Sequence, residues 1–261
     1  MAGDVPIDGP PWPEELLGLK ARLVRAKEQT DGLKEEINRF VNSPGHRFPV
    51  EWNEERTEAT GRVFFDPMPD THRWAVLVGE VLHDLRSALN GLVWQLVIRN
   101  GDVPSRQTEF PIFLDKQRYE TESVIKLRGT SDRVKDQIAR MQPFTLEPEK
   151  APDVALWLLH ELNIVDKHRL VLPVVNALTK ARSTPELPEG MTLSVSRQVG
   201  HGSVVTRISA AGPQPEGLHI QVATGYNVSI DAGSAPKDVA RLLYTCVLET
   251  QNAIATFIGE F

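Results

Sequence analysis

Residues 153–172 read DVALWLLHELNIVDKHRLVL, and the fold and any functional site depend most on this stretch. Apolar residues point in nearly every direction of a helix here, which predicts a largely buried helix that Pro152 opens and Pro173 ends. A buried ionisable group is costly unless it is paired, so the polar side chains must form a network, line a cavity or reach solvent. These polar side chains are His160, Glu161, Asn163, Asp166, Lys167, His168 and Arg169. We therefore look for a functional site here first.

A second apolar helix is expected from about Trp74 to Ile98, capped by Asp70 or Thr71 and ended at Asn100-Gly101. Its core stripe is Val81, Leu85, Leu89, Leu92 and Leu96, and its polar side is Glu80, His83, Arg86, Ser87 and Asn90. The polar side is either a solvated surface or a functional face. The absence of Lys from it favours the functional interpretation, because solvated helix faces usually carry Lys.

The region before residue 45 predicts one long helix. Its apolar or small residues recur at alternating spacings of three and four, which is typical of a helix-packing seam. The seam consists of Leu16, Leu19, Leu23, Ala26, Thr30, Leu33, Ile37 and Phe40. It could pack against this protein's own helices or form a homodimer through the first helix.

Strands are expected in two places. Residues 48–52 and 62–65 predict a short β-hairpin around Thr60-Gly61. From Met191 the apolar residues alternate with polar ones, which predicts a four-stranded antiparallel β-meander with a turn at Thr224-Gly225. Pro236 opens the last helix. The fold class is therefore α+β, in one domain with a helical bundle (13–182 and 236–259) and the β-meander (190–232).

Composition excludes several classes of protein. No apolar run is long enough for a membrane span, and the N-terminus lacks the features of a secretion signal, so we expect a water-soluble, cytoplasmic protein. The net charge of -6 argues against a broad nucleic-acid-binding face. Cys246 is the only cysteine, which excludes an internal disulfide, and it is expected in the core.

These patterns predict a pocket between the two apolar helices that binds a phosphate-bearing or other anionic ligand, a small molecule or RNA. A histidine there would act as general base, and an arginine or lysine would stabilise negative charge, as in ribonuclease-like hydrolysis. We assign catalytic roles to His83, His160 and His168, and ligand-binding roles to Arg86, Asn90, Asn163, Asp166 and Lys167.

Two alternatives stay open. One is a metal-dependent hydrolase or oxygenase with ligands from Glu80, His83, His160, Glu161 and His168. Its Glu-x-x-His pair lacks the second pair that a di-iron site needs, and the sequence leaves the cofactor unknown. The other is a non-catalytic interaction protein whose polar clusters only fix the core.

Three segments resemble a group of uncharacterised bacterial proteins common in actinobacteria. They are LHDLRSALN at 82–90, FPI at 110–112 and LHELNIVDKHR at 159–169. The first segment is also distantly similar to the Arg-x4-6-His signature of HEPN domains, which are helical ribonuclease and nucleotide-binding modules. Arg86 fits that signature, whereas Gly91 stands where its histidine would be. The resemblance implies that catalysis is lost or has moved to His83, His160 or His168.

Overall fold

The computed structural model describes residues 12–183, 190–196, 199–216 and 220–261. The chain divides into two compact units. Unit 1 takes Met1–Leu33, His72–Val171 and Asp231–Phe261, and unit 2 takes Lys34–Thr71 and Leu172–Ile230. The class is α+β, as expected from the sequence. The single domain stays a prediction.

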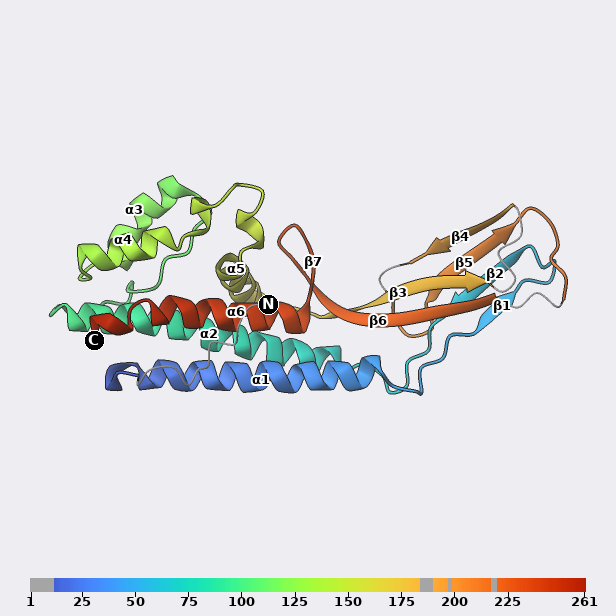
Figure 1. The fold of residues 1–261 in the computed structure, drawn as a ribbon, viewed down its shortest axis with the longest axis horizontal. Helices are drawn as coiled ribbons and strands as arrows, with labels where there is room; N and C mark the ends of the chain where they lie inside the picture. The colour runs from blue at the N-terminus through green and yellow to red at the C-terminus, as the bar shows by residue number, and fades with distance from the viewer. Residues whose placement is uncertain (1–11, 184–189, 197–198, 217–219) are drawn as a thin grey trace. The chain divides into compact units, whose positions relative to one another are not determined.

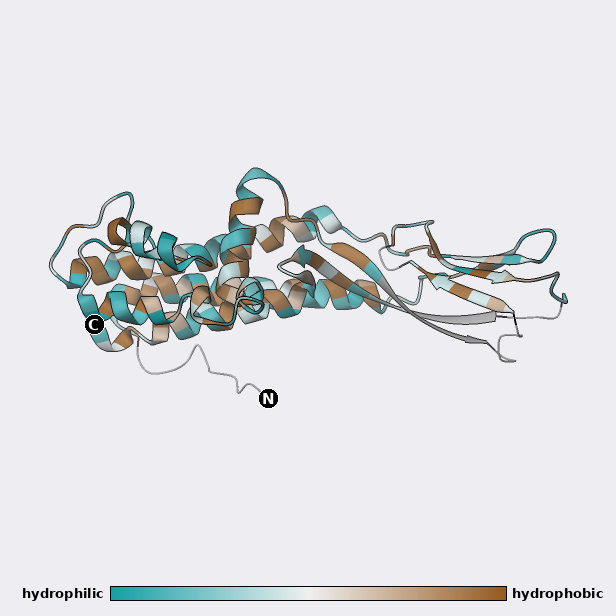
Figure 2. Ribbon diagram, turned by 90° about the horizontal axis from the view of Figure 1, so that it is seen from above, coloured by the Kyte–Doolittle hydropathy of each residue, from teal (hydrophilic) through white to brown (hydrophobic). Residues whose placement is uncertain are grey.

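Unit 1 is built mainly from helices (Figure 1). They are η1 (Glu14–Leu16), α1 (Leu17–Val41), α2 (Thr71–Arg99), α3 (Lys116–Lys126), α4 (Asp132–Arg140), η2 (Pro143–Thr145), η3 (Ala151–Asp153), α5 (Ala155–His168), α6 (Val239–Ala255) and η4 (Ile258–Glu260). Asp115, Ser131 and Asp238 cap α3, α4 and α6 by accepting a backbone N–H. Figure 2 shows hydrophobic and hydrophilic segments alternating along the helices, as expected for helices buried on one side.

The seam of α1 is buried within the chain. Every seam position from Leu16 to Phe40 is at most 7% exposed, and the Thr30 hydroxyl donates a hydrogen bond to the carbonyl oxygen of Ala26 at 2.8 Å. This burial favours the first of the two interpretations, packing against the protein's own residues. The core stripe of α2, from Val81 to Leu96, is buried as predicted.

Helix α5 is less buried than its sequence predicts. It ends at His168, because Arg169 is already extended (φ -160°, ψ 149°) and leads into a strand. The prediction therefore runs four residues too far, to Leu172. Glu161, Ile164, Lys167 and His168 are exposed, so α5 is buried on one side only.

Unit 2 holds most of the strands. They are β1 (Val50–Trp52), β2 (Glu58–Arg62), β3 (Val174–Ser183), β4 (Met191–Val195), β5 (Val204–Ala210) and β6 (Ile220–Ala232), and β7 (Ala235–Asp238) follows in the chain. One antiparallel sheet has the order β1-β2-β5-β4, and the other has the order β3-β6-β7. Among the described residues there is thus a four-stranded antiparallel sheet, but its strands are not four consecutive ones.

Two details of the predicted strands are wrong. Thr224 and Gly225 form no turn, because they pair with Thr179 and Leu178 in one long β6–β3 ladder. Thr60-Gly61 lies inside β2, and the hairpin turn falls earlier, where Asn53 Oδ1 accepts backbone N–H groups at 2.8 and 2.9 Å. Gly61 is needed where it lies, since a Cβ there would approach Thr206 Oγ1 and the Phe48 ring.

Candidate functional site

The Arg86 cluster, formed by Arg86, Glu109, Lys126 and His160, is the strongest candidate site in unit 1. Helix α2 supplies Arg86, α3 supplies Lys126 and α5 supplies His160, while Glu109 lies in the loop between α2 and α3. Glu109 binds Lys126 through Oε1, and its Oε2 lies 3.7 Å from Arg86 Nη2. The loop carboxylate therefore joins α2 to α3, and His160 on α5 is linked to these groups through their charges.

Arg86 is a buried cation with incomplete pairing. The residue is only 6% exposed, and its Nη1 has no hydrogen-bond partner among the described residues. Burial lowers the pKa of Arg86 to about 10, and the charge of Glu109 opposes that change. The guanidinium is still charged at neutral pH, so it holds positive charge and a free donor in a largely dehydrated place.

His160 lies close enough to these groups for their charges to act on it. Burial lowers the pKa of His160 to about 4, helped by the positive charges of Arg86, Lys126 and Lys167 and opposed by Glu109. The imidazole is therefore neutral at pH 7. Its Nδ1 is buried without a hydrogen-bond partner among the described residues.

Glu109 is held in place by its backbone. Its N–H donates to the carbonyl oxygen of Lys126 at 3.3 Å, and the next N–H, of Phe110, donates to Asn90 Oδ1 at 3.1 Å. The Phe110 side chain is fully buried. Burial raises the pKa of Glu109, but the hydrogen bond and charge of Lys126 and the charge of Arg86 outweigh burial and lower it.

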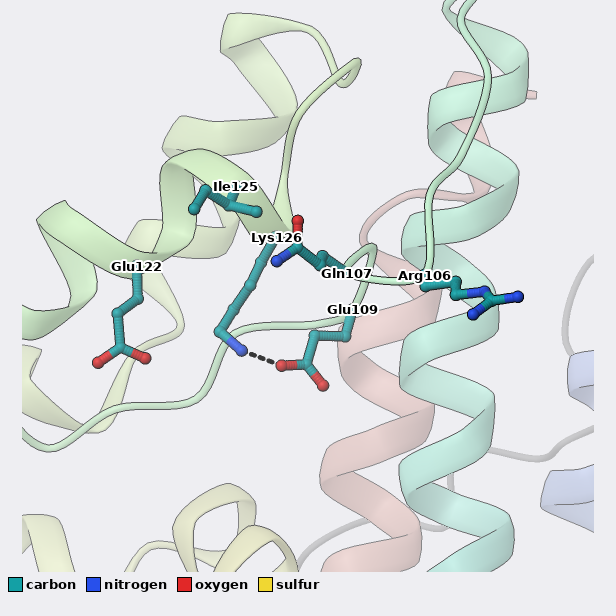
Figure 3. A pocket seen from close by; sticks show the side chains of 6 residues that line it. All are labelled: Arg106, Gln107, Glu109, Glu122, Ile125 and Lys126. Atoms are coloured by element: carbon teal, nitrogen blue, oxygen red, sulfur yellow. Dashed lines mark hydrogen bonds and ion pairs between the residues drawn. The ribbon is translucent and has the colours of Figure 1, made fainter.

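A pocket of about 360 Å³ opens beside the ion pair of Glu109 and Lys126. Figure 3 shows Lys126 and Glu109 pointing toward each other across it, while Arg106 points away from them. The pocket is lined by Arg106, Gln107, Glu109, Glu122, Ile125 and Lys126. Glu109 thus belongs both to the Arg86 cluster and to an open pocket wall.

The structure brings together only some of the predicted site residues. Arg86 and His160 lie in the cluster, and Lys167 acts on His160 through its charge. Asn90 positions the backbone next to Glu109 and is not itself part of the cluster. Asn163, one turn from His160, is buried.

The other predicted residues lie elsewhere. His83 is exposed and its Nε2 is 3.4 Å from Ser87 Oγ, and His168 is exposed at the end of α5. Asp166 packs against α2 at Gly79, where a Cβ would lie 2.4 Å from its Oδ2. Asp166 therefore lies against Gly79 with its Oδ1 buried and without a hydrogen-bond partner among the described residues, and both histidines lie on the surface.

The metal alternative gains no geometric support. Glu80 accepts a hydrogen bond from Gln29 Nε2 at 2.6 Å and lies 3.9 Å from Arg25 Nη2, so it is engaged by α1. Within the described ranges, no three His, Cys, Asp or Glu side chains gather as metal ligands would.

No described helix is long and apolar enough to cross a membrane.

Sequence reasoning missed Glu109 and Lys126. They are separated by 17 positions, and neither lies on the two apolar helices. One signal could have found Glu109, because it directly precedes the Phe-Pro-Ile segment at 110–112 that carries part of the family resemblance. No sequence signal singles out Lys126, which looks like an ordinary cation in the last turn of a helix.

No family model, curated protein or solved structure matches the chain. The resemblance to the bacterial group and to HEPN domains therefore stays a prediction.

Proposed function

We propose that the protein binds a phosphate-bearing anion at the Arg86 cluster. The observation that carries this proposal is the buried guanidinium of Arg86, whose Nη1 has no hydrogen-bond partner among the described residues. A buried donor of this kind is costly unless a ligand or water satisfies it. Guanidinium is also the group that proteins use most for planar, charge-assisted recognition of phosphate.

The surroundings support an anion at this place. Lys126 adds a second positive charge, and neutral His160 can donate a further hydrogen bond from a ring nitrogen. The ligand would enter from the pocket that Glu109 and Lys126 line; Arg86 and His160 are not among its lining residues, so the ligand would meet Glu109 and Lys126 first.

Calorimetric titration with inorganic phosphate at about pH 6, where most of it carries one negative charge, tests the proposal on wild type and the Arg86→Met variant. Loss of a charge-assisted hydrogen bond should weaken binding about 10- to 100-fold. Arg106→Gln is the matched control, because Arg106 lines the same pocket but points away from the pair, and it should bind within about twofold of wild type. Binding that is absent from wild type, or equal in Arg86→Met, would refute the proposal.

Hydrolysis of a phosphodiester, as in a ribonuclease, is the second candidate function. The observation that favours it is the neutral imidazole of His160 beside the Arg86 guanidinium, with its Nδ1 unpartnered among the described residues. An anion bound at Arg86 would offset the positive field and raise the pKa of His160 toward the range in which a general base works. His160 would then take the proton of the attacking 2′-hydroxyl as its oxygen bonds to phosphorus, and the imidazolium would return that proton to the 5′-oxygen as the P–O5′ bond breaks. Arg86 would stabilise the charge on the phosphorus oxygens.

Cleavage of single-stranded RNA separates the hydrolase from a simple binding protein. Relative to wild type, His160→Asn should cut the rate about 10²- to 10⁴-fold, the usual contribution of a general base. His168→Ala, on the exposed end of α5, should keep the full rate. Equal rates in wild type and His160→Asn, or no cleavage by wild type, would eliminate the hydrolase and leave the binding function to be judged by the phosphate titration.

A further inference from the structure

We infer that Glu109 makes the Arg86 cluster selective for singly charged anions, which among phosphate compounds are phosphodiesters such as the RNA backbone. This inference rests on the proposed function and names its ligand class. Glu109 would be a specificity-determining residue, because its carboxylate fixes how much positive charge the site offers.

The charges of the cluster can be counted. Arg86 and Lys126 each carry one positive charge, Glu109 carries one negative charge and His160 is neutral, so these four residues carry one net positive charge. The charges of Arg106 and Glu122 in the pocket lining cancel, and Lys167 is an exposed cation outside the cluster that acts on His160. A phosphodiester anion neutralises this charge. A phosphomonoester, which carries close to two negative charges above pH 7, would leave an excess negative charge beside a buried group.

Glu109 cannot simply leave the site. The backbone bonds of Glu109 to Lys126 and of Phe110 to Asn90 anchor the loop on both sides, and Phe110 is fully buried. The buried polar atoms left without a partner among the described residues are Arg86 Nη1, which donates, and His160 Nδ1, which donates or accepts according to the tautomer, while the carboxylate keeps Lys126 and faces Arg86 Nη2. A ligand binds next to Glu109 and meets its negative charge.

The test measures the ratio of affinities for two small probes at pH 8, dimethyl phosphate with one charge and methyl phosphate with about two. Wild type should prefer dimethyl phosphate. In Glu109→Gln the cluster carries two net positive charges, so the ratio should shift at least about tenfold toward methyl phosphate. Circular dichroism checks that each variant folds.

Two further variants separate charge from shape. Glu109→Gln combined with Lys126→Gln restores one net positive charge and should return the wild-type preference for dimethyl phosphate. Because its net charge is that of wild type, this double variant can be measured where Glu109→Gln alone folds poorly. Glu122→Gln is the matched control, since Glu122 lines the same pocket but binds Arg118 at 2.9 Å, and it should leave the ratio unchanged.

The possible results are distinct. Arg86-dependent binding with a ratio that Glu109→Gln does not move, or a wild-type preference for methyl phosphate, would overturn the role of Glu109 and leave the proposed function standing. Failure of wild type to bind either probe would overturn the proposed function and this inference with it.

Discussion

Asp84 and Arg86 are two buried charges on the same helix, two residues apart, and their surroundings differ. Asp84 is 4% exposed and lies between two cations of α1, with Arg22 Nη1 at 3.0 Å from Oδ1 and Arg25 Nε at 3.4 Å from Oδ2. Arg86 is 6% exposed, has Glu109 as its one ion-pair partner among the described residues, at 3.7 Å, and keeps Nη1 without a hydrogen-bond partner there. Asp84 Oδ2, like Arg86 Nη1, makes no hydrogen bond among the described residues, but it lies within ion-pair distance of Arg25. A buried charge with an opposite charge near both of its atoms holds two helices together, whereas one with a free donor is suited to a ligand.

The largest stability effect expected on the Arg86 side is a dependence on pH. Burial lowers the pKa of His160 from 6.5 to about 4 in the folded state. Between these two pH values the unfolded chain binds a proton at His160 that the folded protein does not bind. Stability from this group is complete above pH 6.5 and is lost as the pH falls toward 4, by on the order of 2–3 kcal/mol. Urea unfolding between pH 4 and 7 measures it. His160→Asn should show a shallower slope, and identical slopes would contradict the account.

The two buried charges should respond differently to removal. Asp84→Asn leaves Arg22 without a carboxylate and Arg25 with Glu80 alone, and because both arginines are half exposed the loss of unfolding free energy should be about 1–2 kcal/mol. Arg86→Met replaces an incompletely paired buried charge with an apolar side chain, so stability should stay equal or rise by about 1 kcal/mol. Urea unfolding at pH 7 compares them.

Phosphate binding sharpens the same contrast. Asp84→Asn should bind phosphate as wild type does, since its partners lie on α1. A larger stability loss in Arg86→Met than in Asp84→Asn would reverse the roles that we assign to the two residues.

The smallest effect concerns the packing of Asp166. A Cβ at Gly79 would come within 2.4 Å of Asp166 Oδ2, so Gly79→Ala should lower stability by about 1 kcal/mol instead of giving the usual gain for a helix. Adding Asp166→Ala should recover the loss in a double-mutant cycle. Additive effects of the two substitutions would show that Asp166 is not the group that needs Gly79.

Local patterns predicted much of the fold but not the long-range pairing. The seam of α1 and the core stripe of α2 follow from helical periodicity, which each segment carries in itself. Thr224-Gly225 looks like a turn, yet the ladder with β3 extends the strand through it, and no local signal reveals that partner. The sequence of helix α5 predicts burial on all sides because its apolar residues point in nearly every direction. The sequence does not show that the rest of the chain covers one side only.

The candidate site was predicted in part for the same reason. Arg86 and His160 were found because ionisable groups on apolar helices are conspicuous. The sequence directs attention first to α5, but the more deeply buried cation, Arg86, is on α2. Glu109 and Lys126 complete the cluster only through the path of a loop, and the surface positions of His83 and His168 depend on packing that periodicity does not define.

The most direct test of the central claim is an NMR titration of the His160 imidazole with and without saturating dimethyl phosphate. We predict a pKa of about 4 in the free protein, and a rise of at least about one unit when the anion offsets the charge of Arg86. In Arg86→Met the pKa should start higher and should not respond to the anion. An ordinary His160 pKa in the free protein, or the same pKa with and without the anion in wild type, would contradict an anion site at the Arg86 cluster.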